Sequence, residues 1–346
     1  MIISFNPIIF QSQDSQIQEK LAEILVVLMK TNNHFLDIKS INTIFYNESG
    51  QYIFDSTQIS QTYFSLKQRK NFKEFLNKKI KVTITDLYNK HLTHIVIGID
   101  EGQKEIHPAN AYRIITERSK VIVENGINDW KFIRGICQKY SSSTKIKRRS
   151  IYKLLDQAIK DEIIESENCG GVGELTKVIQ RWIDSDRYQK IFNYKLMAIF
   201  DSDKQNSNGF VTPHVDKIKY FKSQQTPTNY EYEATDLIIW HILYKRKIEN
   251  YIPLDVLFER IESITQSQKA DLLNKTNEEL DFMEYCQGNI GIGKSEIKEK
   301  FPKMFLADFS YRELEERCEH HKIFLPEANE SIPEIEQILL KMAKII

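Results

Sequence analysis

The sequence of 346 residues has few cysteines, and no two of them form a short motif. The four cysteines are scattered along the second two thirds of the chain, at Cys137, Cys169, Cys286 and Cys318. A zinc ribbon needs closely spaced Cys-x-x-Cys pairs, and a disulfide framework needs more cysteines in a shorter chain. The cysteine pattern therefore argues against both.

Long apolar runs are also missing. No segment approaches the roughly 20 apolar residues that a membrane-spanning helix requires. The N-terminal segment, residues 1–13, lacks the basic start of a signal peptide and soon becomes polar. We therefore expect a cytoplasmic protein that does not act at a membrane.

Net charge is absent as well, because 48 basic residues balance 48 acidic ones. No global positive field attracts the chain to nucleic acid, so such a substrate would have to meet a local basic patch or a partner subunit. The hydrophobic content of 41% and the charged content of 28% are typical of a soluble globular protein. The length suffices for two or three domains.

Acidic residues follow two apolar runs that are typical of buried strands. Glu124 comes directly after residues 120–123, and Asp201 and Asp203 come directly after residues 196–200. In α/β sheets, ligands bind outside the carboxyl ends of the strands. If the second strand continues through Asp203, the two aspartates point to the same face. Their charges would then repel each other unless a cation lies between them.

The middle of the chain alternates strand and helix patterns, which favours a mostly parallel sheet flanked by helices in an α/β fold. We expect helices over 129–140, 151–164 and 174–182, whereas the apolar run 237–243 is too short to assign. The N-terminal region, 1–115, is expected to be mixed α+β. It would contain a helix capped by Asp14 or Ser15, a hairpin over 43–54 and a strand over 94–99. Residues 261–346 are expected to be mainly helical.

Two acidic motifs and a glycine-rich segment between them together resemble the Toprim domain of topoisomerases, primases and several nucleases. Glu124 matches the lone glutamate, residues 169–173 match the glycine segment, and Asp201 and Asp203 match the paired aspartates. The resemblance implies a Toprim-like catalytic domain over 116–260. It lies between an N-terminal region, 1–115, and a helical C-terminal region, 261–346.

Two further acidic residues are candidates for the same site. Asp129 lies five positions after Glu124, one more than in the common Glu-Gly-x-x-Asp form, so Asn128 and Asp129 both fit the second acidic position. Asp129 could equally be the cap of the helix that follows. Resemblance to overcoming-lysogenisation-defect and phage-defence nucleases implies that Glu249 contributes to a second metal site. Alternatively, Glu249 forms simple ion pairs with residues 245–247.

Residues 288–295 satisfy the phosphate-binding pattern G-x-x-x-x-G-K-S. That pattern binds nucleotide phosphates only where a buried strand precedes it and a helix follows it. The residues before it, 280–287, are typical of an amphipathic helix, and too few residues follow to complete a nucleotide-binding sheet. We therefore do not expect ATP to bind there.

The resemblance implies a nuclease that depends on Mg²⁺ or Mn²⁺ and hydrolyses DNA or RNA. Glu124, Asp201 and Asp203 would be the catalytic residues, with Asp129 and Glu249 as further metal ligands. Phosphate contacts are expected from the basic segment that holds Lys145, Lys147, Arg148 and Arg149.

The implied setting is anti-phage defence beside an ATPase partner, and a homo-oligomer is compatible with it. The alternative is a non-catalytic subunit that binds a partner through residues 1–115 and uses the acidic residues to hold a structural metal ion.

Overall fold

The computed structural model describes the chain except residues 32, 81–90, 101–103, 289 and 327–328. Its contacts divide into two compact units. The first unit comprises 1–119, 186–195 and 343–346, and the second comprises 120–185 and 196–342. The main segment of the first unit, 1–119, ends near the boundary expected at residue 115, whereas most of residues 261–346 belong to the unit that holds the acidic motifs.

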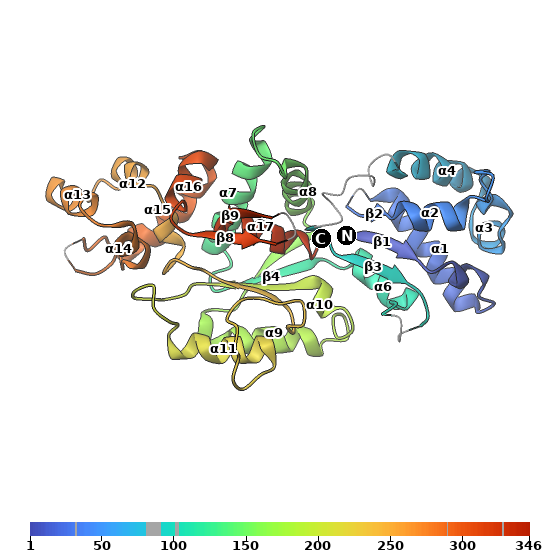
Figure 1. Ribbon diagram of the computed structural model, residues 1–346, viewed down its shortest axis with the longest axis horizontal. Coiled ribbons are helices and arrows are strands. Elements are labelled where there is room, and N and C mark those ends of the chain that lie inside the picture. The colour runs from blue at the N-terminus through green and yellow to red at the C-terminus, as the bar shows by residue number, and fades with distance from the viewer. Residues whose placement is uncertain (32, 81–90, 101–103, 289, 327–328) are drawn as a thin grey trace. The chain divides into compact units, whose positions relative to one another are not determined.

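The first unit contains a parallel three-stranded sheet in the order β2-β1-β3. Helices flank the strands, and α1 packs against α6 (Figure 1). Asp14 caps α1 by accepting a hydrogen bond of 2.8 Å from the Gln16 N–H, and is thus the one of the two expected cap residues that the fold uses. The elements are β1 (Ile2–Phe5), η1 (Pro7–Gln11), α1 (Ser15–Lys30), β2 (Phe35–Leu36), α2 (Ile38–Phe45), η2 (Phe54–Ser56), α3 (Gln58–Tyr63), α4 (Leu66–Ile80), β3 (His94–Ile97), α6 (Pro108–Thr116) and α10 (Phe192–Lys195).

The hairpin expected over 43–54 is only partly present. Residues up to Phe45 belong to helix α2, which buries Ile41, Ile44 and Phe45 on one face. Only the turn survives, with a single bridge between Tyr46 and Tyr52. The strand prediction was wrong because a short run of β-branched and aromatic residues also satisfies the helical period.

The second unit is built on a four-stranded sheet in the order β5-β4-β6-β7. β4 (Ser119–Val123) pairs with β6 (Leu196–Phe200), and β6 pairs with β7 (Ile239–Ile242), in both cases in parallel. Figure 1 shows α9 and α11 on one side of this sheet and α7, α8 and α17 on the other. The α/β class with helix-flanked parallel strands is therefore confirmed.

Helices make up most of the remaining second unit. Helix α7 packs so closely on α15 that a Cβ at Gly135 would collide with the backbone of Phe305. The elements are α7 (Asn128–Ser142), α8 (Arg149–Lys160), β5 (Ile164–Asn168), η4 (Val172–Glu174), α9 (Leu175–Asp184), α11 (Thr212–Lys222), η5 (Ile248–Tyr251), α12 (Leu254–Arg260), α13 (Gln266–Leu273), α14 (Asn277–Phe282), α15 (Lys294–Ala307), α16 (Tyr311–Arg317), β8 (Lys322–Leu325), β9 (Glu330–Pro333) and α17 (Glu334–Ala343).

Two of these strands interrupt a region that the sequence predicts to be helical. β8 and β9 pair in antiparallel fashion between α16 and α17. Only Leu325, Ile332 and Pro333 of the eight strand residues are buried, so the hydrophobic pattern of a strand is weak there. None of the helices in the described ranges combines enough length and apolar character to span a membrane.

Candidate functional site

Glu124 lies directly after β4, at the carboxyl end of the parallel strands. Its Oε1 accepts a hydrogen bond of 3.1 Å from the backbone N–H of Asp201, which follows the neighbouring strand β6. The backbone N–H of Val172 also donates to this carboxylate. Val172 follows Gly170 and Gly171, whose φ angles of 76° and 127° suit glycine. The glycine segment thus directs a backbone donor to Glu124.

Asp201 and Asp203 do not continue the strand, because β6 ends at Phe200. The N–H groups of Ser202 and Asp203 donate to the Arg246 carbonyl oxygen at 3.1 and 3.0 Å. Asp203 has a left-handed φ of 50°, which aspartate tolerates better than most residues. The strand geometry assumed for the two aspartates is therefore wrong, and a tight turn positions them instead.

Asp129 is not the helix cap that the sequence left open, because Ile127 occupies the cap position of α7. The side chain of Asn125 makes the hydrogen bonds at the start of the helix instead. Its Oδ1 accepts from the N–H groups of Ile127 and Asn128 at 3.1 and 3.0 Å. Asp129 Oδ2 accepts from the Asn125 N–H at 2.8 Å. Asp129 is therefore tied to the loop that follows Glu124.

Glu249 lies in η5, seven residues beyond the end of β7, and not at a strand end. Its neighbour Asn250 is buried and donates to the carbonyl oxygens of Leu280 and Met283 at 2.8 and 3.0 Å. These two hydrogen bonds hold η5, and with it Glu249, against the residues around α14. The Oε2 atom of Glu249 is buried and has no hydrogen-bond partner among the described residues.

These residues form one electrostatic group, which we call the acidic cluster: Glu124, Asp129, Asp201, Asp203 and Glu249. Burial raises the pKa of Glu124, and the charge of Asp203 raises it further. Burial is the main reason why the pKa of Asp129 rises to about 7, with added repulsion from Glu124 and Glu249. Burial also raises the pKa of Asp201 well above its ordinary value, and repulsion from the rest of the cluster adds to the increase.

The acidic cluster has the donor chemistry of a hard divalent cation, although its carboxylates are not gathered at coordination distance. No group of three or more His, Cys, Asp or Glu side chains within the described ranges could hold a metal ion as it stands. The unpartnered Oε2 of Glu249 and the mutual repulsion of the carboxylates both fit a cation as the missing partner. Carboxylate oxygens are the ligands that Mg²⁺ and Mn²⁺ prefer.

Lysines lie beside the acidic cluster. Lys247 Nζ is 3.8 Å from Asp203 Oδ1 and 3.2 Å from Glu284 Oε2. A cavity of about 280 Å³ is lined by Lys247, Glu249 and two lysines of α15, Lys294 and Lys298. Lys294 and Lys298 are exposed and form no hydrogen bond or ion pair with any residue that the structure describes. They are one helical turn apart, so both can face one ligand.

Lys294 is the lysine of the G-x-x-x-x-G-K-S pattern, and it begins helix α15. Helix α14 ends at Phe282, and no strand occurs in the described residues between it and Lys294. Asn289 lies outside the described residues. The strand that a nucleotide-binding P-loop requires is thus missing from the part described, as expected. The lysine of this pattern, Lys294, nevertheless lines a cavity together with Glu249 of the acidic cluster. The sequence analysis did not predict this position.

Three residues of the basic segment expected to contact phosphates form hydrogen bonds or ion pairs with other residues of the protein. Arg148 is buried and pairs with Glu330 and, at 2.9 Å, with Glu336. Lys147 Nζ is 3.0 Å from Glu330, and Arg149 Nε donates to the Ser141 carbonyl oxygen at 3.1 Å. Of the four cationic side chains, Lys145 alone is exposed and has no hydrogen bond or ion pair to another described residue.

His214 is a further polar residue at the site that sequence reasoning missed. It lies in α11, where its Nε2 is 2.9 Å from the Asp201 carbonyl oxygen and its ring stacks on Phe200. Its Nδ1 is buried without a partner among the described residues. A lone histidine in a surface helix carries no sequence signal for such a position.

Comparison of the chain with protein-family models, with curated proteins and with solved structures found no match. The case for a function therefore rests on the geometry and electrostatics of the acidic cluster and its lysines.

Proposed function

We propose that the protein is a divalent-metal-dependent nuclease of the Toprim type, with Mg²⁺ or Mn²⁺ as its cofactor. The observation that carries the proposal is the acidic cluster itself. Its carboxylates follow two adjacent parallel strands or lie in η5, at the edge of the sheet where α/β folds bind ligands. Burial, with added repulsion from neighbouring carboxylates, raises the pKa of Glu124, Asp201 and Glu249.

In this proposal Glu124, Asp201 and Asp203 hold the metal, with Asp129 and Glu249 as further ligands. A bound divalent ion lowers the pKa of a ligand water and neutralises charge on a scissile phosphate. The Asp201 and Val172 amides fix the orientation of Glu124. Lys247 offsets part of the negative charge near Asp203, and Lys294 and Lys298 bind phosphates of the substrate backbone.

The biological setting proposed with this activity is anti-phage defence beside an ATPase partner. It follows from the resemblance of the acidic motifs to phage-defence nucleases.

Cleavage assays test the proposal. Wild-type protein, alone and with its cellular partner, is incubated with plasmid, single-stranded DNA and total tRNA in Mg²⁺, Mn²⁺ or EDTA. Cleavage in metal, its loss in EDTA and its loss in Glu124→Gln are expected, because this variant removes the charge but keeps the hydrogen-bonding shape. Full cleavage by Glu124→Gln would reject the mechanism.

A non-catalytic subunit with a structural ion is the second candidate. The observation that favours it is that Glu124 and Asp129 both accept backbone hydrogen bonds, as carboxylates with a structural role do. Protein that is inert toward every substrate, even with its partner present, would favour this candidate.

A further inference from the structure

A second cavity of about 170 Å³ lies along β7 and beside α17, within the same unit as the acidic cluster. Aromatic rings dominate its walls: Phe210, Tyr230, Tyr232, Trp240 and Tyr244. Tyr244 is stacked on His321, with ring centroids 3.4 Å apart and planes within 6°. Such walls favour a flat ring system as the occupant, because aromatic faces stack on one another.

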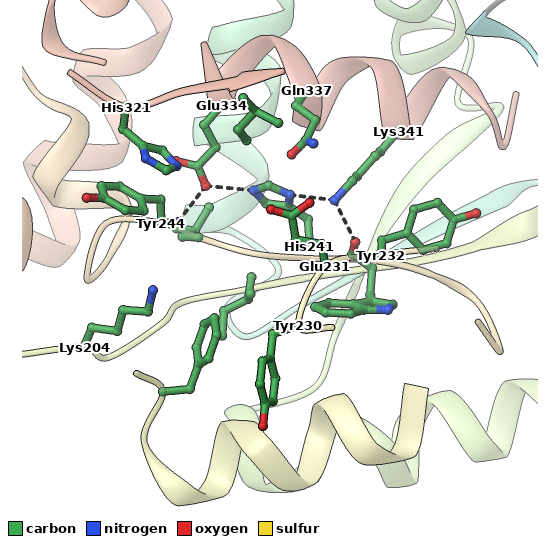
Figure 2. A pocket seen from close by; sticks show the side chains of 15 residues that line it. Lys204, Tyr230, Glu231, Tyr232, His241, Tyr244, His321, Glu334, Gln337 and Lys341 are labelled. Atoms are coloured by element: carbon green, nitrogen blue, oxygen red, sulfur yellow. Dashed lines mark hydrogen bonds and ion pairs between the residues drawn. The ribbon is translucent and has the colours of Figure 1, made fainter. Parts of the chain in front are cut away.

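Lys204 lines this cavity without an oxygen partner for its ammonium among the described residues. Its residue is only 8% exposed, yet its ammonium forms no hydrogen bond or ion pair with any described residue. The Nζ atom lies 4.2 Å from the ring centre of Phe210 and 5.5 Å from that of Tyr244. Figure 2 shows its side chain reaching into the cavity from the side opposite α17. A nearly buried cation without an oxygen partner leaves hydrogen-bond donors for a ligand.

The acidic groups of the cavity are already satisfied or lie at its edge. Glu334 accepts hydrogen bonds from His241 Nε2 at 2.8 Å, from the Tyr244 N–H at 2.6 Å and from the Tyr251 hydroxyl. Lys341 donates to His241 Nδ1 at 3.0 Å, which completes this network (Figure 2). Glu231 is exposed. Lys204 and Lys341 balance the two carboxylates of the lining, so the cavity has no excess of positive charge that would favour a phosphate dianion over an uncharged ring with acceptor atoms.

We propose that this cavity binds one unpaired nucleobase of a nucleic-acid substrate, with Lys204 donating to a ring nitrogen or carbonyl oxygen of the base. Lysine donates in this way to guanine O6 and N7 in other complexes. A cavity of about 170 Å³ admits a single ring system, so the base enters from a single strand or after leaving its duplex.

The turn after β6 connects this cavity to the acidic cluster. Lys204 directly follows Asp203, and Arg246 Nη1 donates to the carbonyl oxygens of both residues, at 3.3 and 2.9 Å. A base held by Lys204 therefore places its own sugar-phosphate backbone near Asp203. The inference rests on the proposed nuclease function and adds to it that cleavage depends on the identity of a base beside the scissile phosphate.

Calorimetry in EDTA tests the cavity without cleavage. Wild-type protein is titrated with single-stranded homo-oligonucleotides of each base and with the four mononucleotides. We expect oligonucleotides to bind with a preference among bases, and Lys204→Met to weaken the preferred one by roughly tenfold or more, the loss expected for one charge-assisted hydrogen bond. Lys204→Arg, which keeps the charge, should retain part of the affinity. Lys153→Met is the control, because Lys153 is exposed on α8.

Three outcomes would overturn the proposal. They are an affinity unchanged in Lys204→Met, an absence of base preference in the wild type, and mononucleotides that bind as tightly as oligonucleotides, which would indicate a free nucleotide as the ligand. Cleavage assays separate this failure from that of the nuclease proposal. Metal-dependent cleavage whose base preference survives Lys204→Met would reject only the cavity, whereas base-dependent binding without any cleavage would reject only the nuclease.

Discussion

The backbone N–H of Asp201 donates to the carboxylate of Glu124 at 3.1 Å, which joins the loop after β4 directly to the loop after β6. The two motifs lie 77 positions apart in the sequence, and the parallel pairing of β4 with β6 brings them together. This hydrogen bond therefore links the two strand-end motifs of the acidic cluster directly to each other.

Metal binding should depend on the turn after β6. Asp201→Ala/Asp203→Ala is expected to abolish binding of Mg²⁺ or Mn²⁺ measured by calorimetry, because it removes two of the clustered carboxylates. The chain provides a matched control in its other Asp-Ser-Asp sequence, where Asp184 and Asp186 are exposed. Asp184→Ala/Asp186→Ala should bind metal like the wild type. Equal binding by both double variants would place the metal elsewhere.

Neutralising one cluster carboxylate should stabilise the metal-free protein. Asp201→Asn removes a charge that is partly buried among four others, so we expect the free energy of unfolding in EDTA to rise by about 1 kcal/mol. Added Mg²⁺ should stabilise the wild type but not this variant, because only a bound ligand shifts the unfolding equilibrium. Urea unfolding with and without Mg²⁺ measures both effects, and Asp184→Asn, at an exposed position, should show neither.

The lysines of α15 should bind the substrate backbone. Lys294→Ala/Lys298→Ala is expected to weaken nucleic-acid binding and to reduce the slope of log affinity against log salt by about 1 to 2, because two phosphate contacts are lost. Lys300→Ala/Lys303→Ala removes the same charge from the same helix. Lys300 and Lys303 are paired with Glu296 and Glu299, so this control should change the slope less.

An ATP analogue serves as a second probe of Lys294, since this residue is the lysine of the G-x-x-x-x-G-K-S pattern. We expect no specific binding of the analogue. Binding that is lost in Lys294→Ala would identify a nucleotide site and contradict the assignment of this lysine to nucleic-acid phosphates.

Arg148 should matter for stability and not mainly for substrate binding. Arg148→Ala leaves Glu330 and Glu336 without their buried partner, so a loss of about 3 to 5 kcal/mol in the free energy of unfolding is expected. Lys145→Ala changes an exposed side chain and should stay within about 0.5 kcal/mol of the wild type. Equal unfolding midpoints in urea for the two variants would show that the ion pairs contribute little.

Lys195 should make stability depend on pH in the first unit. Burial lowers the pKa of Lys195 from 10.5 to about 7, while Glu117 opposes part of the shift. Between pH 7 and pH 10 the unfolded chain then binds more protons at this residue than the folded chain, so the free energy of unfolding rises with pH. Lys195→Met should be more stable than the wild type at pH 7, by on the order of 4 kcal/mol, and the difference should shrink toward pH 10. Unfolding in urea at several pH values measures the difference.

The sequence predicts the parallel sheet and the meeting of Glu124 with Asp201 because both depend on local patterns: apolar runs followed by acidic residues. It does not predict the left-handed turn at Asp203, which depends on a carbonyl oxygen 43 positions away, at Arg246. The sequence analysis did not predict strand β5, because its residues after Ile164 are polar and only half-buried or exposed. Pairing with β4 stabilises this strand, and a local pattern carries no information about that partner.

The network around Glu334 bears on how the protein is made. Its partners Tyr244 and His241 precede it by 90 and 93 positions. Because translation proceeds from the N-terminus, the β7 segment leaves the ribosome before Glu334, whose carboxylate accepts hydrogen bonds from it. A nascent chain halted ahead of Glu334 therefore contains every member of the acidic cluster but lacks the support for the adjoining cavity. Glu334 also accepts from the Tyr251 hydroxyl of η5, so the segment that holds Glu249 likewise receives this support only after Glu334 has been translated.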